Sequence, residues 1–225
     1  MRNRVGYWRL AGLIALPAAL IAGPAQPASA SASYSAPLRT AISSLRVTAE
    51  IRTGYVRTLF PHWIDADGDG CDTRNEVLIA EATVSPRVSS RVGSRCGLTG
   101  GRWYAYVNNT SYLATSSLDI DHVVALAEAW DSGARTWTTA RRRAYANDLG
   151  DPRSLVAIKD SVNQSKGDRD PAGWMPPYAG ATCRYVTDWV AVKIRWRLTA
   201  DPAERATLVR IAATCANTTL RVAYA

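Results

Sequence analysis

The stretch "SLDIDHVVALAEAW" (residues 117–130) places two aspartates and a histidine inside a run of β-branched and apolar residues. Together with a second apolar run and the residues after it, it predicts a strand over 118–126, a strand over 154–159 and a short helix over 160–166. Strand, strand and helix in this order can form a hairpin with the helix laid across it. Neighbouring strand residues point to opposite faces, so Asp121 and His122 can share one site only where the strand ends or bulges.

The residue types in this segment are those of metal-assisted phosphodiester hydrolysis. Asp121 offers a carboxylate and Asn163, in the short helix, offers an amide oxygen. These hard oxygen ligands suit Mg²⁺, Mn²⁺ or Ca²⁺ rather than a tight zinc site. A histidine beside such an ion, here His122, can deprotonate a water molecule, while the ion polarises the phosphate and stabilises the departing oxygen.

The segment resembles the HNH nuclease family, whose fold is called ββα-metal. It is similar to the secreted actinobacterial members and to the C-terminal domain of the GmrSD restriction endonucleases. The shared motifs are "DIDHVVALAEAW" (119–130) and "NQSKGDRDPAGWMP" (163–176), with further pieces at 70–78, 145–158 and 183–196. The resemblance covers roughly Leu38 to Cys215. It implies an α+β fold with a ββα-metal core at about 116–170, embedded in a mostly helical single domain over 38–225.

The resemblance also implies roles for individual residues. His122 would be the general base, and Asp121 and Asn163 would hold the metal, Mg²⁺ or Mn²⁺. Lys166 would join His122 as a catalytic residue and, with Arg169, would meet phosphate oxygens. These residues also have a non-catalytic interpretation. His122 would then be a hydrogen-bonded structural residue, and Lys166 and Arg169 would be surface cations.

Three further positions are given supporting roles by the resemblance. Asp119 precedes the metal ligand on the strand, and Glu128 is either an auxiliary ligand or part of a solvated helix face. The middle asparagine of the family, which ties down the hairpin loop, is replaced by Ser154. Ser154 would then be a weaker hydrogen-bonding group, unless Asn147 takes this role.

The first thirty residues have the layout of a secretory signal peptide. Three arginines precede an apolar stretch from Leu10 to Gly23, and Ala28-Ser29-Ala30 offers a cleavage site. The apolar stretch is short for a membrane span and contains Pro17, so we expect it to be removed. No later segment is apolar enough to cross a membrane. Residues 31–37 would then be a flexible leader of a secreted protein.

Charge and cysteine content agree with this compartment. Removing the three arginines of the signal peptide lowers the net charge from +8 to +5, which suits a polyanionic partner such as nucleic acid, or simply a soluble basic surface. An exported chain with four cysteines predicts two disulfides. Of the three pairings, Cys71–Cys96 with Cys183–Cys215 is favoured because each pair closes a modest local loop.

The rest of the chain has weaker secondary-structure signals. Residues 76–84 fit either a strand or a helix. The other expected elements are helices over 38–60, 135–147 and 187–197, an extended loop over 85–102, a short strand within 102–109, and a last helix starting at Asp201-Pro202.

The acidic segment "DADGDGCDTRNE" (65–76) matches the calcium-binding loop of EF-hands. The matching positions are Asp65, Asp67, Asp69, Gly70, Cys71 through its carbonyl group, and Glu76. An EF-hand loop lies between two helices, and the sequence predicts only the preceding one clearly. A structural Ca²⁺ site and an acidic surface turn are therefore both consistent with the sequence.

The sequence thus predicts a secreted, divalent-metal-dependent, nonspecific endonuclease that acts on DNA or RNA through the nucleic-acid backbone. We expect it to be a monomer. The alternative is a non-enzymatic secreted module that binds calcium, cell wall or nucleic acid, and this alternative leaves Asp121, His122 and Asn163 unexplained. A protease or esterase ranks last, because the chain has no H-E-x-x-H or G-x-S-x-G motif.

Overall fold

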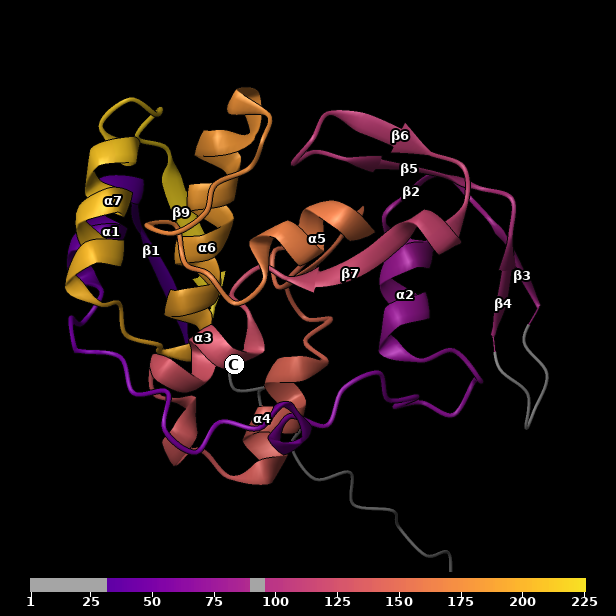
Figure 1. Ribbon diagram of the computed structural model, residues 1–225, viewed down its shortest axis with the longest axis horizontal. Helices are drawn as coiled ribbons and strands as arrows, with labels where there is room; N and C mark the ends of the chain where they lie inside the picture. Colours follow the sequence, from indigo (N-terminus) through magenta and orange to yellow (C-terminus); the bar gives the residue numbers. More distant parts are fainter. Residues whose placement is uncertain (1–31, 90–95) are drawn as a thin grey trace, which may run out of the picture. The chain divides into compact units, whose positions relative to one another are not determined.

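A two-stranded antiparallel sheet and the helix after it carry the residues of the central motif. In the computed structural model, which describes residues 32–89 and 96–225, β7 (Leu118–His122) pairs with β8 (Leu155–Lys159). The register runs from Leu118 opposite Lys159 to His122 opposite Leu155, without a bulge. Helix α5 (Asp160–Lys166) begins directly after β8 and packs against both strands (Figure 1). The predicted order of strand, strand and helix is confirmed.

The two faces of β7 differ in chemistry. Leu118 and Ile120 pack with Trp103 and with residues of α2 (Thr73–Ala80) in a small apolar cluster. Asp119 and Asp121 alternate with them and bond to residues of α5. Strand β8 is buried on both faces, so the hairpin lies between the small cluster and the large core of the protein.

The predicted strand over 118–126 is four residues too long. β7 ends at His122, and the apolar run continues into α3 (Leu126–Asp131), every residue of which is buried. A short apolar run that is buried on all sides has no periodicity to separate strand from helix.

The large core is built around α6 (Thr182–Trp196). It packs against α7 (Pro202–Ala212), α1 (Leu38–Ser44) and a two-stranded sheet of β1 (Ser33–Pro37) and β9 (Thr219–Ala223). Helix α7 starts as predicted, with Asp201 and Glu204 forming a capping box and proline at the first helical position. Helix α6 begins five residues earlier than the predicted 187.

Two expectations for the N-terminal part are wrong. The helix predicted over 38–60 ends at Ser44, because the following segment bonds to Ala200: the Thr48 amide donates to its carbonyl, and its amide donates to Arg46. Gly54 has φ +84°, which an α-helix does not accommodate. Residues 33–37 of the supposed flexible leader form β1, whose partner β9 lies at the other end of the chain. The predicted signal peptide lies outside the described residues.

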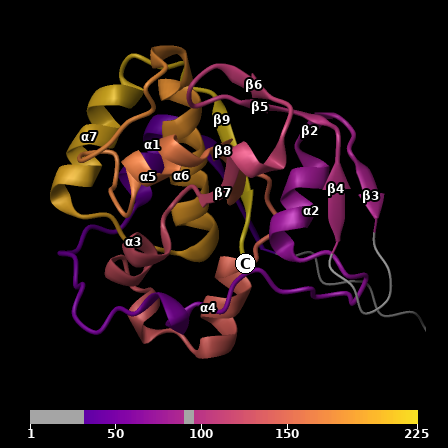
Figure 2. The same ribbon diagram turned by 45° about the vertical axis from the view of Figure 1, so that its right-hand side comes forward.

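Short strands surround α2. They form a sheet of β2 (Ala82–Val84), β5 (Arg102–Ala105) and β6 (Thr110–Tyr112), and a pair of β3 (Arg87–Ser89) and β4 (Gly97–Thr99), seen beside α2 in Figure 2. The ambiguous stretch 76–84 is therefore helix and then strand. The loop expected over 85–102 contains β3, whose residues are exposed, and β4, which is partly buried.

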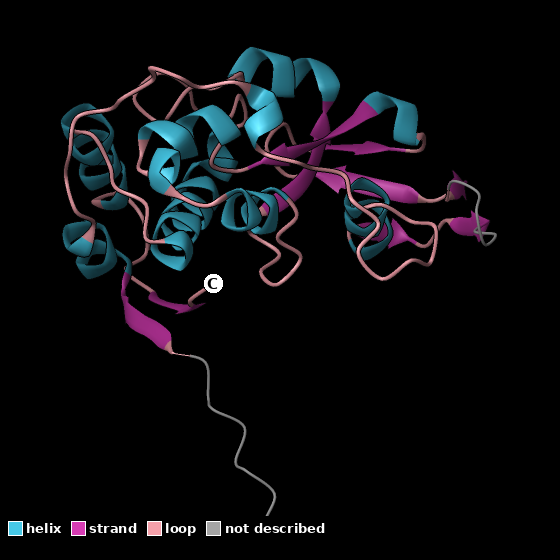
Figure 3. Ribbon diagram, turned by 90° about the horizontal axis from the view of Figure 1, so that it is seen from below, coloured by secondary structure: helices cyan, strands magenta, loops and turns pink. Residues whose placement is uncertain are grey.

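The remaining elements complete a mixed α/β fold of helices and small separate sheets (Figure 3). They are α4 (Thr139–Ala146) and four 3₁₀ turns, Arg57–Leu59, Thr115–Ser117, Ala134–Thr136 and Ala179–Ala181. Both favoured disulfides, Cys71–Cys96 and Cys183–Cys215, are present. Among the described residues, none of the helices combines the length and the apolar character needed to span a membrane.

Candidate active site

His122 is held in one tautomer by a backbone carbonyl. Its Nε2 lies 2.9 Å from the carbonyl oxygen of Ala146, the last residue of α4. A carbonyl oxygen only accepts, so Nε2–H donates and Nδ1 carries the free lone pair. Burial lowers the pKa of His122 to about 3. The imidazole is therefore neutral near pH 7, with its basic nitrogen at Nδ1.

Two aromatic rings fix the plane of the His122 ring. Trp63 stacks on it at 5.5 Å between centroids and Tyr145 at 6.3 Å, with interplanar angles of 29° and 19°. The Tyr145 hydroxyl donates to the carbonyl of Val124, just beyond β7. Trp63 adopts φ 57°, in the left-handed region that bulky residues seldom occupy. Backbone strain of this kind is often found at functional sites, where the surrounding structure holds the strained residue in place.

Asp121 forms a buried ion pair with Lys166. The Lys166 ammonium lies 2.7 and 2.8 Å from the two carboxylate oxygens and also donates to the carbonyl of His122 at 2.7 Å. The lysine side chain has no exposed surface. Burial raises the pKa of Asp121, while the charge of Lys166 acts in the opposite direction.

Asn163 lies next to Asp119 rather than Asp121. Its Nδ2 donates to Asp119 Oδ2 at 3.2 Å, and both side chains are partly exposed. Asn163 and Lys166, from α5, therefore meet Asp119 and Asp121 on one face of β7. The side chain of His122 lies on the opposite face of the strand, toward α4, because β7 reaches His122 without a bulge.

Asn147 and Ser154 both form hydrogen bonds in the connection between β7 and β8. Asn147 Oδ1 accepts from Thr73 Oγ1 at 2.9 Å and from the Ile64 amide at 3.2 Å, and its Nδ2 donates to the carbonyls of Pro61 and Arg143 at 2.8 Å. The segment that carries Trp63 is thereby fastened to the end of α4. Ser154 donates to Asp148 Oδ2 at 2.7 Å, a bond within the connection itself.

We expect Ser154→Ala to lower the free energy of unfolding by about 1.5–3 kcal/mol, the usual contribution of a hydrogen bond to a charged group. The loss is limited because Asp148 keeps its bonds to Arg195 and to Trp196 Nε1. Urea denaturation of the two proteins measures the difference. A loss above about 3 kcal/mol, beyond what a hydrogen bond to a charged group contributes, would show that Ser154 holds more of the hairpin than this bond.

The two other supporting residues lie apart from the hairpin face. Glu128 accepts from Lys193 Nζ and Ser132 Oγ, both at 2.7 Å, in a buried network that continues to Glu204. Arg169 is exposed and donates through Nε to the carbonyl of Lys166 at 3.1 Å. Neither side chain hydrogen-bonds to Asp121 or Asn163 in the described part of the chain.

Sequence reasoning missed the residues that orient His122. Trp63 and Tyr145 lie far from it in sequence and look like ordinary apolar residues, and the Ala146 carbonyl carries no side-chain signal at all.

Residues 72–211 match the family described as the C-terminal domain of GmrSD restriction endonucleases. The chain belongs to this family. The matched range contains β7, β8 and α5 with every residue discussed for the hairpin, and the family points to a nuclease-related function. Most of the acidic loop precedes the match, so the loop is not part of what defines the family in this chain.

A curated relative extends the comparison. An uncharacterized secreted protein of Arthroderma benhamiae (strain ATCC MYA-4681 / CBS 112371) is 41% identical over 162 residues, which cover 72% of this chain and 76% of the relative. With its two disulfides, this member of the GmrSD C-terminal-domain family is a secreted protein. No solved structure matches the chain.

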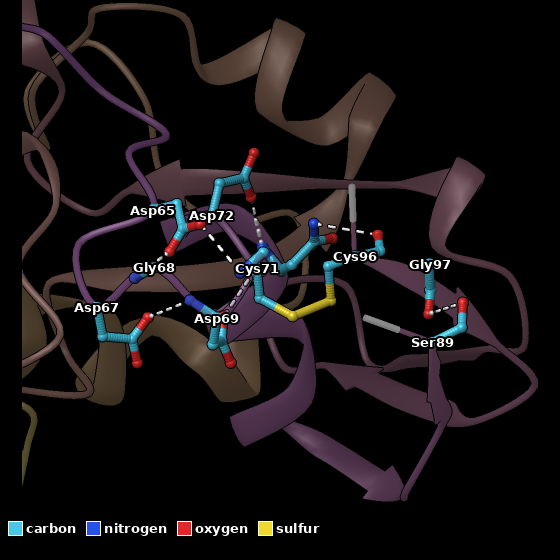
Figure 4. The surroundings of a disulfide bond; sticks show 11 residues. Asp65, Asp67, Gly68, Asp69, Cys71, Asp72, Ser89, Cys96 and Gly97 are labelled. Carbon is cyan, nitrogen blue, oxygen red and sulfur yellow. Dashed lines mark hydrogen bonds between the residues drawn. A yellow bond between two sulfur atoms is a disulfide. The ribbon is translucent and has the colours of Figure 1, made fainter. Parts of the chain in front are cut away.

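The acidic loop is closed by its own hydrogen bonds (Figure 4). Asp65 accepts from the amides of Gly68 and Gly70 at 2.8 and 3.0 Å, and Asp69 accepts from the Cys71 amide at 2.7 Å. Carboxylate oxygens of Asp65, Asp67 and Asp69 lie within 4.8 Å of one another. Glu76 lies in the first turn of α2, where burial and then the three aspartates raise its pKa.

Proposed function

We propose that this family member is a secreted, divalent-metal-dependent endonuclease that hydrolyses the phosphodiester bonds of DNA without reading base sequence. RNA contains the same bond and is the second substrate to test. The observation that carries the proposal is the hydrogen bond from His122 Nε2–H to the Ala146 carbonyl. It leaves a neutral imidazole whose free lone pair is fixed at Nδ1, as a general base requires. Burial, which lowers the pKa of His122 to about 3, weakens it as a base, and its side chain lies across β7 from Asp121. In this proposal β7, β8 and α5 are the ββα-metal core.

The candidate metal ligands are Asp121 and Asn163, with Asp119 beside them. The donor set of carboxylate and amide oxygens fits Mg²⁺ or Mn²⁺, and Mg²⁺ sites with one or two protein carboxylates are completed by water and substrate phosphate. When bound, the ion would polarise the phosphate and stabilise the leaving 3′ oxygen. Lys166 already contacts both Asp121 oxygens, so the ion would compete with its ammonium group for this carboxylate.

Basic side chains are available for phosphates near the hairpin. Arg169 follows α5 and Arg143 lies on α4, and both are exposed. Arg57 is also exposed, and its charge contributes to the lowered pKa of His122. Arg142 is unavailable because it is buried and donates to the Leu59 and Trp137 carbonyls. Phosphate contacts of this kind predict nucleic-acid affinity that falls with salt.

The test is incubation of the mature protein, disulfides intact, with supercoiled plasmid and Mg²⁺ or Mn²⁺, with and without EDTA. We expect nicked and linear products with metal and intact plasmid with EDTA. The same lanes with RNA define the substrate range. A non-enzymatic binding module would instead retard the plasmid without cutting it, and that result would contradict the proposed activity.

We also propose that the acidic loop holds a structural Ca²⁺ ion. The support is the EF-hand spacing together with the clustering of Asp65, Asp67 and Asp69, with Glu76 at the last template position. Cys71 can contribute only its carbonyl, because its sulfur is in the disulfide. The ion would stabilise the native state without taking part in hydrolysis.

A further inference from the structure

A second cluster of carboxylates lies away from both the hairpin and the acidic loop. Glu50, in the irregular segment after α1, has a carboxylate oxygen within 4.8 Å of those of Glu128 and Asp131 on α3. Glu50 is also grouped in the same way with Asp170 and Asp201. A surface cleft of about 490 Å³ is lined by Glu50, Glu128, Asp170 and Asp201, among others.

Acidic side chains outnumber basic ones in the lining of this cleft. Around it stand seven carboxylates: Glu50, Glu128, Asp131, Asp168, Asp170, Asp201 and Glu204. Among the neighbouring cations, Arg52 contacts Asp131 and Asp168, Lys193 bridges Glu128 and Glu204, and Arg169 lines the cleft. Arg46, Arg135 and Arg197 line a second cleft together with Asp131. Burial and the charge of Glu128 raise the pKa of Glu50 to about 8, so the carboxylates of this group oppose one another's ionisation.

One oxygen of the cluster has no partner. Asp131 Oδ1 is buried and accepts no hydrogen bond in the described part of the chain, and the Asp131 side chain is 1% exposed. Both contacts from Arg52 go to Oδ2. A buried carboxylate oxygen without a donor is costly. Asp131 is also the last residue of α3, where the helix dipole disfavours an anion.

We propose that Glu50, Glu128 and Asp131 bind a Ca²⁺ ion, with Asp170 and Asp201 adding negative charge around it. The donors are all carboxylate oxygens, without histidine or a free cysteine, which selects a hard cation. Calcium suits ligands from an irregular segment because it accepts six to eight oxygens in flexible geometry. Glu128 can contribute Oε2, since its hydrogen bonds within the described residues use Oε1.

The ion would fasten the irregular segment to the protein. Residues 46–54 are exposed, and the main-chain bonds that hold the segment run to Ala200. Glu50 lies on this segment, whereas Glu128 and Asp131 lie on α3 and Asp201 caps α7. Calcium would therefore add a link between these three parts of the chain, beside the Arg52–Asp131 ion pair and the bond from Trp130 Nε1 to the Thr53 carbonyl.

The test uses a background in which the acidic loop cannot respond: Asp65→Asn, Asp67→Asn and Asp69→Asn together, which keep the side-chain oxygens that close the loop. Calcium is titrated into this protein by calorimetry, and its Tm is measured. We expect one site with Kd on the order of 10⁻³ to 10⁻⁴ M, as in extracellular calcium modules. At tenfold excess over Kd, the Tm should rise by roughly 3–6 °C.

Adding Glu50→Gln to the background should weaken this binding by about tenfold or more, since it removes a charged ligand. Glu50 is exposed, so the substitution leaves the packing intact. Asp168→Asn is the matched control, because Asp168 lines the same cleft and belongs to neither carboxylate group. A background protein that binds no calcium would overturn the proposal. So would an unchanged Kd in Glu50→Gln, or an equal loss in Asp168→Asn. The difference between wild type and the background reports the loop site separately.

Discussion

His122→Gln is expected to slow DNA cleavage by about 10²–10⁴-fold, the usual contribution of a general base. The glutamine amide can donate to the Ala146 carbonyl as Nε2–H of His122 does. It has no basic nitrogen in place of Nδ1. The substitution therefore removes the proposed base but keeps a hydrogen bond to the Ala146 carbonyl, so the fold should be retained.

The measurement is the initial rate of plasmid nicking by purified wild type and His122→Gln in Mg²⁺ or Mn²⁺, with circular dichroism to confirm folding. His62→Gln is the matched control, because His62 also contacts a backbone carbonyl, that of Phe60 at 2.8 Å. It should cut within about threefold of wild type, since it lacks a general-base role. A folded His122→Gln protein with the wild-type rate would show that His122 is not the base.

Lys166→Met is expected to lower the free energy of unfolding by about 3–5 kcal/mol, the effect of removing one partner of a buried ion pair. Methionine keeps most of the volume of the lysine stem. It leaves the Asp121 carboxylate, which accepted two bonds from Nζ, buried without a donor, and it also leaves the His122 carbonyl without this donor. Urea denaturation followed by tryptophan fluorescence measures the loss.

The double variant Asp121→Asn with Lys166→Met should recover much of that stability, because a neutral pair has no uncompensated buried charge. Lys159→Met is the matched control. Its partner Asp160 is adjacent in sequence, and their side chains are 31% and 38% exposed. Such an exposed pair contributes little to stability. A loss in Lys166→Met no larger than in the control would contradict the importance of the buried pair.

Local patterns predicted the hairpin well because their signals are short-range. Helix α5 spans the predicted 160–166, and the two disulfides join the cysteines nearest in sequence. Capping chemistry confined to one turn predicted the start of α7, through Asp201, Pro202 and Glu204. In each case, the residues that decide the structure lie within a few positions or one modest loop.

Long-range pairing explains the failures. Strand β1 forms because residues 219–223 lie beside it, and α1 stops at Ser44 because the chain turns to bond with Ala200. Long-range contacts also place the side chains of Asp121 and His122 in different surroundings. The residues that surround each of them, Lys166 for one and Trp63 with Tyr145 for the other, are brought close only by the fold. The motif identifies the candidate residues, but it does not predict on which face of β7 each side chain lies.

The chemistry of the cut ends tests the central claim most directly. Supercoiled plasmid is nicked by the wild-type protein in Mg²⁺ or Mn²⁺, freed of protein and treated with DNA ligase, with no kinase step. Metal-dependent hydrolysis with the 3′ oxygen leaving predicts 5′-phosphate and 3′-hydroxyl ends, so ligase should reseal the nicks. Nicks that ligase cannot seal, or plasmid left uncut with every metal, would contradict the account.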